Sequence, residues 1–249
     1  MDTADYIDVL DREGRALAAA AAGAGPDAKV PTCPGWQVRD LLRHTGMVHR
    51  WATAFVAEGL TSYRPDGGLP DLDGDALLDW FAQGHRTLVD TLAAAPSDLD
   101  CWHFLPAPSP VAFWARRQAH ETTVHRYDAE SARGGTPTGI DPGFAVDGVD
   151  ELLRGFHARG KSRVRSAEPR VLRIRATDVP DDGGLWTVRL SDEPLVTERG
   201  TGTGDADCEI SGPAGGLYLA LWNRAPFPEV TGDGAVADLW RATSAVTWS

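Results

Sequence analysis

The segment AHETTVHRYDAE, residues 119–130, holds two histidines and three acidic residues within twelve positions. Glu121 and His125 stand four residues apart, so on an α-helix their side chains would project from the same side, one turn apart. Such a crowded segment is either the solvated face of a helix or a group of polar side chains held inside the protein. The apolar residues around it distinguish these two interpretations.

The apolar residues around this segment recur at helical spacing and define one buried side of a predicted helix. Glu121 and His125 fall on this side, so we predict that both face the protein interior. Arg117 falls on another face, and His120 and Glu130 are expected to point mostly outward. The residues of the predicted buried side are Val111, Trp114, Gln118, Glu121, His125 and Ala129.

A second predicted helix, over residues 37–58, shows the same anomaly. His44 falls on its apolar side, whereas His49 falls well off that side. A carboxylate and two imidazoles in a protein interior require an explanation, because an unpaired buried charge is costly. Either the side chains form a hydrogen-bonded cluster without a metal, or His44, Glu121 and His125 hold a divalent metal ion. Two histidines, one carboxylate and an open position form a common catalytic zinc site, and they also resemble a non-haem iron site.

The order of the predicted elements indicates the fold class. Helical spacing dominates residues 1–160, and the pairs Ser109–Pro110 and Asp141–Pro142 mark helix starts. From about residue 168 the segments RVLRIRAT and LWTVRLSD alternate in the manner of strands, and PLVTERG and DCEISG are further candidate strands. We therefore predict an α+β protein, with an antiparallel four-helix bundle over residues 1–160 and a small α+β domain over residues 161–249.

Composition and charge argue against several classes of function. The chain of 249 residues has a formal net charge of −12 and no run of basic residues, so we expect no nucleic-acid partner. It has no apolar stretch of the length of a membrane span and no signal-peptide pattern at its N-terminus, so we expect a cytoplasmic protein without a membrane partner. Cys33, Cys101 and Cys208 are odd in number and far apart, which argues against a disulfide framework and a CxxC zinc site.

Several motifs resemble one known family. PGWQVRDLLRHTG (residues 34–46) and HETTVHRYDAE (residues 120–130) are similar to the mycothiol-dependent maleylpyruvate isomerase family, a branch of the DinB-like four-helix bundles. GPAGGLYLALWNR (residues 212–224) and EVTGDGAVADLW (residues 229–240) resemble the second domain of that family. The resemblance covers most of the chain and implies a DinB-like bundle followed by a small α+β domain.

The resemblance also implies roles for individual residues. Members of the family hold a zinc ion with a histidine of the second helix and with a glutamate and a histidine, four apart, of the fourth. These positions correspond to His44, Glu121 and His125, and Ni²⁺ or Fe²⁺ would accept the same ligands. Mycothiol is the implied co-substrate. Arg224 matches the motif of the second domain and would hold a substrate carboxylate, with an ordinary surface arginine as the alternative.

Asp128 follows His125 by three residues and lies on nearly the same side of the predicted helix. We expect its carboxylate to accept a hydrogen bond from a ligand imidazole on a neighbouring helix and to fix the tautomer of that ring. The alternative is an ion pair with Arg126 or Arg43. Cys33 is expected to pack as a small apolar residue. Trp36, Trp51, Trp114 and Trp222 are candidates for pocket walls or for core packing.

The candidate site favours an enzyme that activates a thiol. A metal ion deprotonates a bound thiol, and the thiolate is the nucleophile. In a maleylpyruvate isomerase the sulfur of mycothiol adds to the double bond of a cis-enedioate, and it is eliminated after rotation about the carbon–carbon bond. Attack on another small-molecule electrophile would make the protein a mycothiol S-transferase. The alternatives are a metallohydrolase that uses zinc-bound water, with Asp128 as base, and a non-enzymatic metal- or ligand-binding protein.

Overall fold

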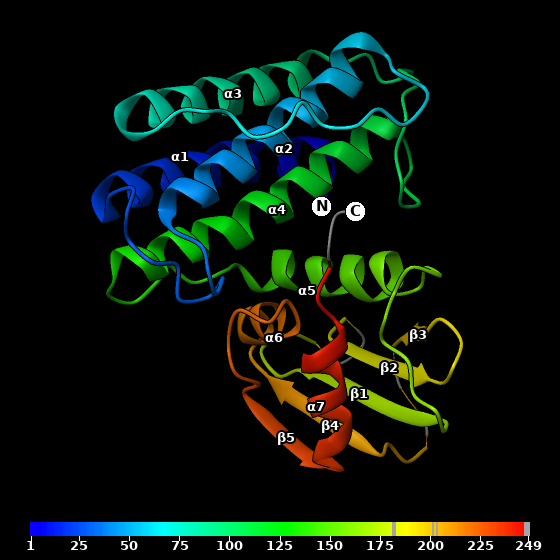
Figure 1. Cartoon of the computed structure of the whole chain (residues 1–249). Coiled ribbons are helices and arrows are strands. Elements are labelled where there is room, and N and C mark those ends of the chain that lie inside the picture. The colour runs from blue at the N-terminus through cyan, green and yellow to red at the C-terminus, as the bar shows by residue number, and fades with distance from the viewer. Residues whose placement is uncertain (181–182, 201, 203, 247–249) are drawn as a thin grey trace. The chain divides into compact units, whose positions relative to one another are not determined.

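The chain forms two compact units. The computed structural model describes residues 1–180, 183–200, 202 and 204–246 (Figure 1). The first unit is Met1–Thr138 and the second is Gly139–Ser249.

The division between the units lies earlier than the boundary expected after residue 160. Helix α5 (Pro142–Asp150) packs against α6 (Ala214–Leu221), and the π-helical turn η1 (Glu151–Phe156) contacts β3 (Val196–Arg199). Both helices therefore belong to the second unit. Helical spacing identifies such elements in a sequence but does not indicate which core they join.

Four long helices make up the first unit, as the sequence predicted. Helix α1 packs against α3 and α4, and α2 also packs against α3 and α4, so each helix has two main neighbours. Their shared core is filled by apolar side chains such as Leu17, Leu41 and Phe81, which are buried. The helices are α1 (Thr3–Ala24), α2 (Val38–Glu58), α3 (Gly74–Ala94) and α4 (Pro110–Arg133).

The start of α4 is fixed by the predicted cap. Ser109 precedes Pro110, and its hydroxyl oxygen accepts a hydrogen bond from the backbone N of Ala112 at 3.1 Å. Proline suits the first helical position because its missing N–H would have no partner there. The cap sets the point at which the helix begins, and with it the residues of α4 that share a face.

Helix α4 is buried on nearly every face, which corrects part of the sequence analysis. Arg117, His120 and Glu130 were expected on other faces or outward, but each is at most 4% exposed. Arg126 on α4 finds its partners inside the unit. Arg126 Nε donates to Glu13 Oε2 at 2.7 Å, and its Nη1 donates to Glu130 Oε2 at 2.9 Å. Helical periodicity reveals an apolar face but not a face buried by paired polar groups.

His49 was likewise expected away from the apolar side of α2, and it is fully buried. Its Nε2 lies 2.9 Å from the hydroxyl oxygen of Thr122 on α4. Burial is the main cause that holds the pKa of His49 well below its usual value, and neighbouring His85 lowers it further. His49 is therefore a neutral imidazole inside the bundle.

Helices α2 and α3 approach each other closely at Gly46. A β-carbon at this position would lie 2.2 Å from Cζ3 of Trp80, so only glycine fits without a shift of the indole ring. The guanidinium of Arg50 packs on the same ring, with its central carbon 3.7 Å from the ring centroid. This contact fixes the position of α2 against α3, and His44 lies two residues before Gly46 on α2.

The segment between α1 and α2 is held by its own backbone hydrogen bonds. Val30 N donates to Trp36 O at 3.0 Å, and Trp36 N donates to Cys33 O at 3.0 Å. Gly35 has a φ of 92°, a left-handed conformation that glycine adopts without steric cost. This turn places Trp36 directly before α2.

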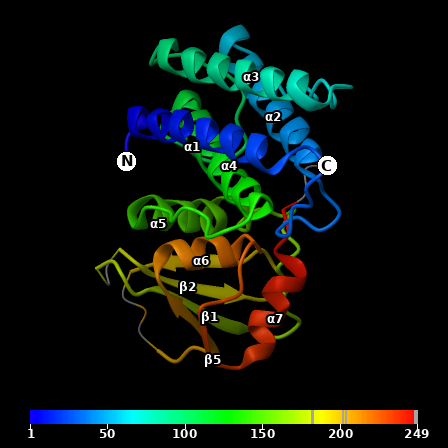
Figure 2. The same cartoon turned by 90° about the vertical axis from the view of Figure 1, so that its left-hand side faces the viewer.

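The second unit is a five-stranded sheet with helices packed on it, and the α+β class is thus confirmed. The strand order is β3-β2-β1-β4-β5, with β1 antiparallel to β2 and parallel to β4. Figure 2 shows α5 and α6 on one side of the sheet. The strands and the last helix are β1 (Arg170–Ala176), β2 (Leu185–Leu190), β3, β4 (Cys208–Gly212), β5 (Glu229–Gly232) and α7 (Gly234–Thr243).

One strand of this sheet was not predicted. All four residues of β5 are exposed, so the segment lacks the alternation of buried and exposed positions that identifies a strand in a sequence. The strand exists because it pairs with the edge of β4, for example Glu229 with Ser211. Such an edge strand depends on its neighbour rather than on its own pattern.

Two expectations about the whole chain can be compared with the structure. Cys33, Cys101 and Cys208 are free thiols. In the described part of the chain, no helix combines the length and the apolar character that crossing a bilayer requires.

Candidate metal site

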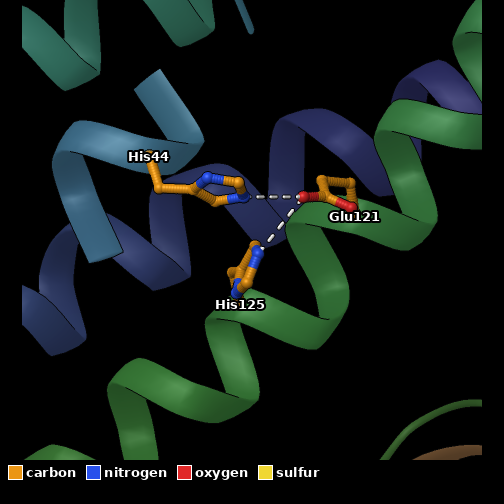
Figure 3. Close-up of side chains that lie close together, drawn as sticks. All are labelled: His44, Glu121 and His125. Atoms are coloured by element: carbon orange, nitrogen blue, oxygen red, sulfur yellow. Dashed lines mark hydrogen bonds and ion pairs between the residues drawn. The ribbon is translucent and has the colours of Figure 1, made fainter. Parts of the chain in front are cut away.

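Three side chains from two helices converge inside the first unit. His44 comes from α2, and Glu121 and His125 come from α4, one turn apart (Figure 3). Glu121 Oε1 lies 3.2 Å from His44 Nε2 and 3.2 Å from His125 Nε2. One donor atom of each residue lies within 4.8 Å of the other two, and the described residues contain no other group of this kind. These are the three residues that the sequence analysis selected.

Two of the three donor separations suit a zinc ion. Metal–ligand bonds of about 2.0–2.1 Å at tetrahedral angles place neighbouring donor atoms about 3.3 Å apart. The two separations of 3.2 Å at Glu121 are close to this value. Two imidazoles and one carboxylate also leave a fourth position for water or a substrate, which is the arrangement of a catalytic rather than a structural zinc site.

Glu121 is a charged carboxylate in this arrangement. Burial by itself raises the pKa of its carboxyl group. Hydrogen bonds from His125 and His44, together with the charges of His125 and Arg117, outweigh burial and hold the pKa well below its usual range. The ionised form is the one that ligates a metal.

Asp128 fixes the orientation of the His125 ring. His125 Nδ1 donates to Asp128 Oδ2 at 2.9 Å, so Nε2 faces Glu121. Burial lowers the pKa of His125, but hydrogen bonds to Asp128 and Glu121 outweigh it and raise the pKa to about 9. A metal ion bound at Nε2 would take the place of the proton on that nitrogen. We expected this imidazole on a neighbouring helix. It lies on the same helix, because residues three apart share a face.

The carboxylate of Asp128 also binds the segment before α2. Thr32 Oγ1 donates to Asp128 Oδ1, and Cys33 Sγ donates to Asp128 Oδ2 at 3.3 Å. Cys33 therefore acts as a hydrogen-bond donor in addition to the packing role expected of it. Through these bonds Asp128 connects α4 to the turn that ends at Trp36.

Trp36 forms an aromatic wall against the two imidazoles. Its ring centroid lies 5.1 Å from that of His44 and 6.2 Å from that of His125, with an angle of 21° between the Trp36 and His125 planes. The two imidazoles meet edge to face at 5.2 Å. An aromatic ring packed against both histidines restricts their rotation.

Comparisons with known proteins identify the family of the chain. Residues 8–130 match the mycothiol maleylpyruvate isomerase N-terminal domain, and residues 143–241 match the MDMPI C-terminal domain. The chain belongs to the mycothiol maleylpyruvate isomerase family. It is an enzyme of this type, and the resemblance seen in the sequence is confirmed for both domains.

Solved structures with the isomerase fold support this assignment. The crystal structure of the mycothiol-dependent maleylpyruvate isomerase has a TM-score of 0.63 at 12% sequence identity, and 93% of each chain is covered. A variant of that isomerase with one histidine replaced by alanine has a TM-score of 0.62 at 11% identity, with the same coverage. At these identities the likeness establishes the fold. A comparison with curated proteins gave no match.

One charged residue near the three donors in this isomerase-family bundle was missed by the sequence analysis. Arg117 lies one turn before Glu121 on α4, and its Nη2 donates to Glu121 Oε2 at 3.3 Å. A basic and an acidic residue four apart on a helix are a recognised pair, so the signal was present. It was overlooked because Arg117 was assigned to another face.

Arg224 lies in the MDMPI C-terminal domain, directly after α6. Asn223 has a φ of 59°, the left-handed conformation that commonly ends a helix. Arg224 N then donates to Leu219 O at 2.7 Å, and its Nη1 donates to Trp222 O at 2.9 Å. The side chain is half-buried and extends from a fixed turn.

The remaining candidate tryptophans lie in aromatic packing in the two isomerase-family domains. Trp51 and Trp114 meet edge to face at 5.3 Å, and Trp114 is fully buried. Trp222 packs edge to face against Phe156 at 5.6 Å. These contacts favour core packing for the three residues, whereas Trp36 lies against the candidate ligands.

Proposed function

We propose that this enzyme binds a zinc ion through His44, Glu121 and His125 and activates mycothiol for attack on an electrophilic substrate. The reaction that we propose is the cis–trans isomerisation of maleylpyruvate. The observation that carries the proposal is the convergence of three donor atoms, with Glu121 Oε1 3.2 Å from both Nε2 atoms. Membership of the isomerase family supports the thiol and the substrate.

The residues of the site have distinct tasks. When bound, the zinc ion supplies the positive charge that lowers the pKa of a coordinated thiol, so that the thiolate forms at neutral pH. Asp128 accepts the Nδ1 hydrogen of His125 and leaves Nε2 as the ligating atom. Glu121 supplies the negative charge of the ligand set, and Trp36 restricts the rotation of the imidazoles.

The proposed reaction regenerates its thiol. The thiolate sulfur forms a bond to one carbon of the cis double bond, and the π electrons move onto the adjacent carbonyl group. The remaining single bond rotates. When the electrons return, the double bond re-forms in the trans geometry and the carbon–sulfur bond breaks. Mycothiol is therefore required but not consumed.

A dicarboxylate substrate needs a cationic partner, and we propose that Arg224 holds one of its carboxylates. A guanidinium donates two parallel hydrogen bonds to a carboxylate and so fixes its orientation. The turn at Asn223 and the contact with Trp222 O restrict the side chain of Arg224, which suits a residue that orients a substrate.

Metal analysis of the purified protein tests the site. We expect about one zinc ion per chain, as a single catalytic site requires. His44→Ala and Glu121→Ala each remove one donor and should lose the metal. His103→Ala alters an exposed histidine and is the matched control, with zinc content unchanged. Zinc retained at the wild-type level in both site variants would contradict the proposal.

Activity assays test the reaction. The zinc-loaded enzyme is incubated with maleylpyruvate with and without mycothiol, and the two isomers are followed by NMR. Isomerisation should require mycothiol and leave its concentration unchanged. Consumption of mycothiol into a stable adduct would identify an S-transferase instead. Isomerisation at the same rate without any thiol would contradict the mechanism.

A further inference from the structure

Arg117 on α4 is a buried, charged side chain. Its side chain is 2% exposed, and arginine is almost never buried so completely unless it is paired. Its Nη2 donates to Glu121 Oε2 at 3.3 Å, and both residues are on α4, one turn apart. The guanidinium therefore lies directly behind the carboxylate that faces the two histidines.

The two oxygens of Glu121 have different partners. Oε1 faces the Nε2 atoms of His44 and His125, and Oε2 accepts the hydrogen bond from Arg117. A carboxylate binds a metal through one oxygen or through both. A hydrogen bond to Oε2 favours binding through Oε1 alone, because the second oxygen is already engaged with a cation.

We propose that Arg117 is a positioning residue that holds Glu121 as a single-oxygen ligand. This arrangement keeps the fourth position of the metal open for the thiol. The inference rests on the proposed function, because it assumes the metal site described above.

A second buried arginine on the same helix provides a matched control. Arg126 is also 2% exposed and forms ion pairs with Glu13 and Glu130. Neither of these carboxylates is among the three candidate ligands. Replacement of Arg126 therefore measures what the loss of a buried arginine does to α4 in general.

Cobalt(II) is a suitable probe, because its visible absorption is strong in four-coordinate sites and weaker in five-coordinate ones. In Arg117→Gln the charge is lost and Oε2 becomes available to the metal. We expect Co²⁺ to bind about tenfold more weakly, the usual effect of removing a partner of a metal ligand. The visible absorption of the Co²⁺-loaded variant should weaken as the coordination number rises. Arg117→Lys restores a cation and should recover most of the wild-type spectrum.

The outcomes separate this inference from the proposed function. Arg126→Gln should lower the melting temperature and leave the Co²⁺ spectrum of the folded protein unchanged. An unchanged spectrum and affinity in Arg117→Gln, or equal changes in both variants, would overturn the role of Arg117. A wild-type protein that binds neither Co²⁺ nor Zn²⁺ would overturn the proposed metal site and the inference with it.

A measurement on the unaltered protein gives the same answer if Arg117→Gln does not fold. A crystal structure of the zinc-loaded wild-type chain should show Glu121 bound through Oε1, with Arg117 on Oε2. Two-oxygen binding by Glu121, or an Arg117 side chain turned away from it, would overturn the inference.

Discussion

At the scale of single residues, Asp128 links a candidate ligand to the segment before α2. It is fully buried, and its carboxylate accepts hydrogen bonds from His125, Thr32 and Cys33. A buried carboxylate that accepts several hydrogen bonds is fixed in position. It therefore orients a ligand ring and the turn before α2 at the same time.

We predict that Asp128→Asn weakens zinc binding by about 10- to 100-fold, because the His125 ring loses the anion that fixes its Nδ1 hydrogen. Competition with a chelator measures the affinity. Thr32→Val is the control, since it removes another partner of Asp128 and leaves the bond to His125 in place. Equal affinities in Asp128→Asn and the wild type would show that this bond does not support the site.

The sequence was sufficient to find the three candidate ligands and the partner Asp128, but not Arg117 or Thr32. His44, Glu121 and His125 interrupt apolar sides of predicted helices, and a polar residue on such a side is visible without a structure. Arg117 and Thr32 act through contacts with Glu121 and Asp128. Thr32 belongs to a turn 96 residues from Asp128, and no periodic pattern indicates such a pairing.

At the scale of elements, the region after η1 contains a buried neutral histidine. His157 is 3% exposed, its Nδ1 lies 3.0 Å from Ser162 Oγ, and its ring packs against Trp240 at 5.0 Å. Burial is the main cause that lowers the pKa of His157 to about 4, and the charge of Arg165 contributes. Protonation of His157 therefore destabilises the folded state.

We predict that the second unit loses stability between about pH 6.5 and pH 4. In this window the unfolded chain binds a proton at His157 and the folded chain does not, so stability falls as the pH falls. The loss is on the order of 3 kcal/mol, from about 1.4 kcal/mol per unit of pKa. Urea unfolding at pH 6.5 and pH 4 measures it. His157→Phe keeps a ring against Trp240 and should lose less stability than the wild type; an equal loss would contradict the prediction.

Helices and strands differ in how far their own residues predict them. Helix α4 begins where Ser109 and Pro110 predicted it, because a cap is a local interaction that a few residues specify. Strand β5 and the placement of α5 and η1 with the second unit escaped prediction. Each of these elements depends on a partner distant in the sequence. Strand β5 pairs with β4, α5 packs against α6, and η1 contacts β3.

At the scale of the whole molecule, all three candidate ligands belong to the first unit, Met1–Thr138. A ligand that binds only the folded form stabilises it by about 2.7 kcal/mol at a hundredfold excess over its Kd. We predict that zinc slows amide hydrogen exchange in α2 and α4 and leaves exchange in β1, β2 and β4 unchanged. Hydrogen-exchange mass spectrometry with and without zinc measures both regions.

Glu121→Ala is the control for this experiment, and it should show no protection by zinc in either unit. Equal protection of the helices and the strands in the wild type would mean that the two units unfold together. That result would contradict the independent unfolding that we expect of two compact units.

The close approach at Gly46 has a consequence for how this sequence changes in evolution. The imidazole of His44 is carried by α2, and the position of α2 depends on the Trp80 ring of α3, which supplies no ligand. A larger residue at position 46 is tolerated only if residue 80 becomes smaller in the same lineage. We therefore expect positions 46 and 80 to vary together among relatives that keep the histidine, although neither side chain meets a substrate.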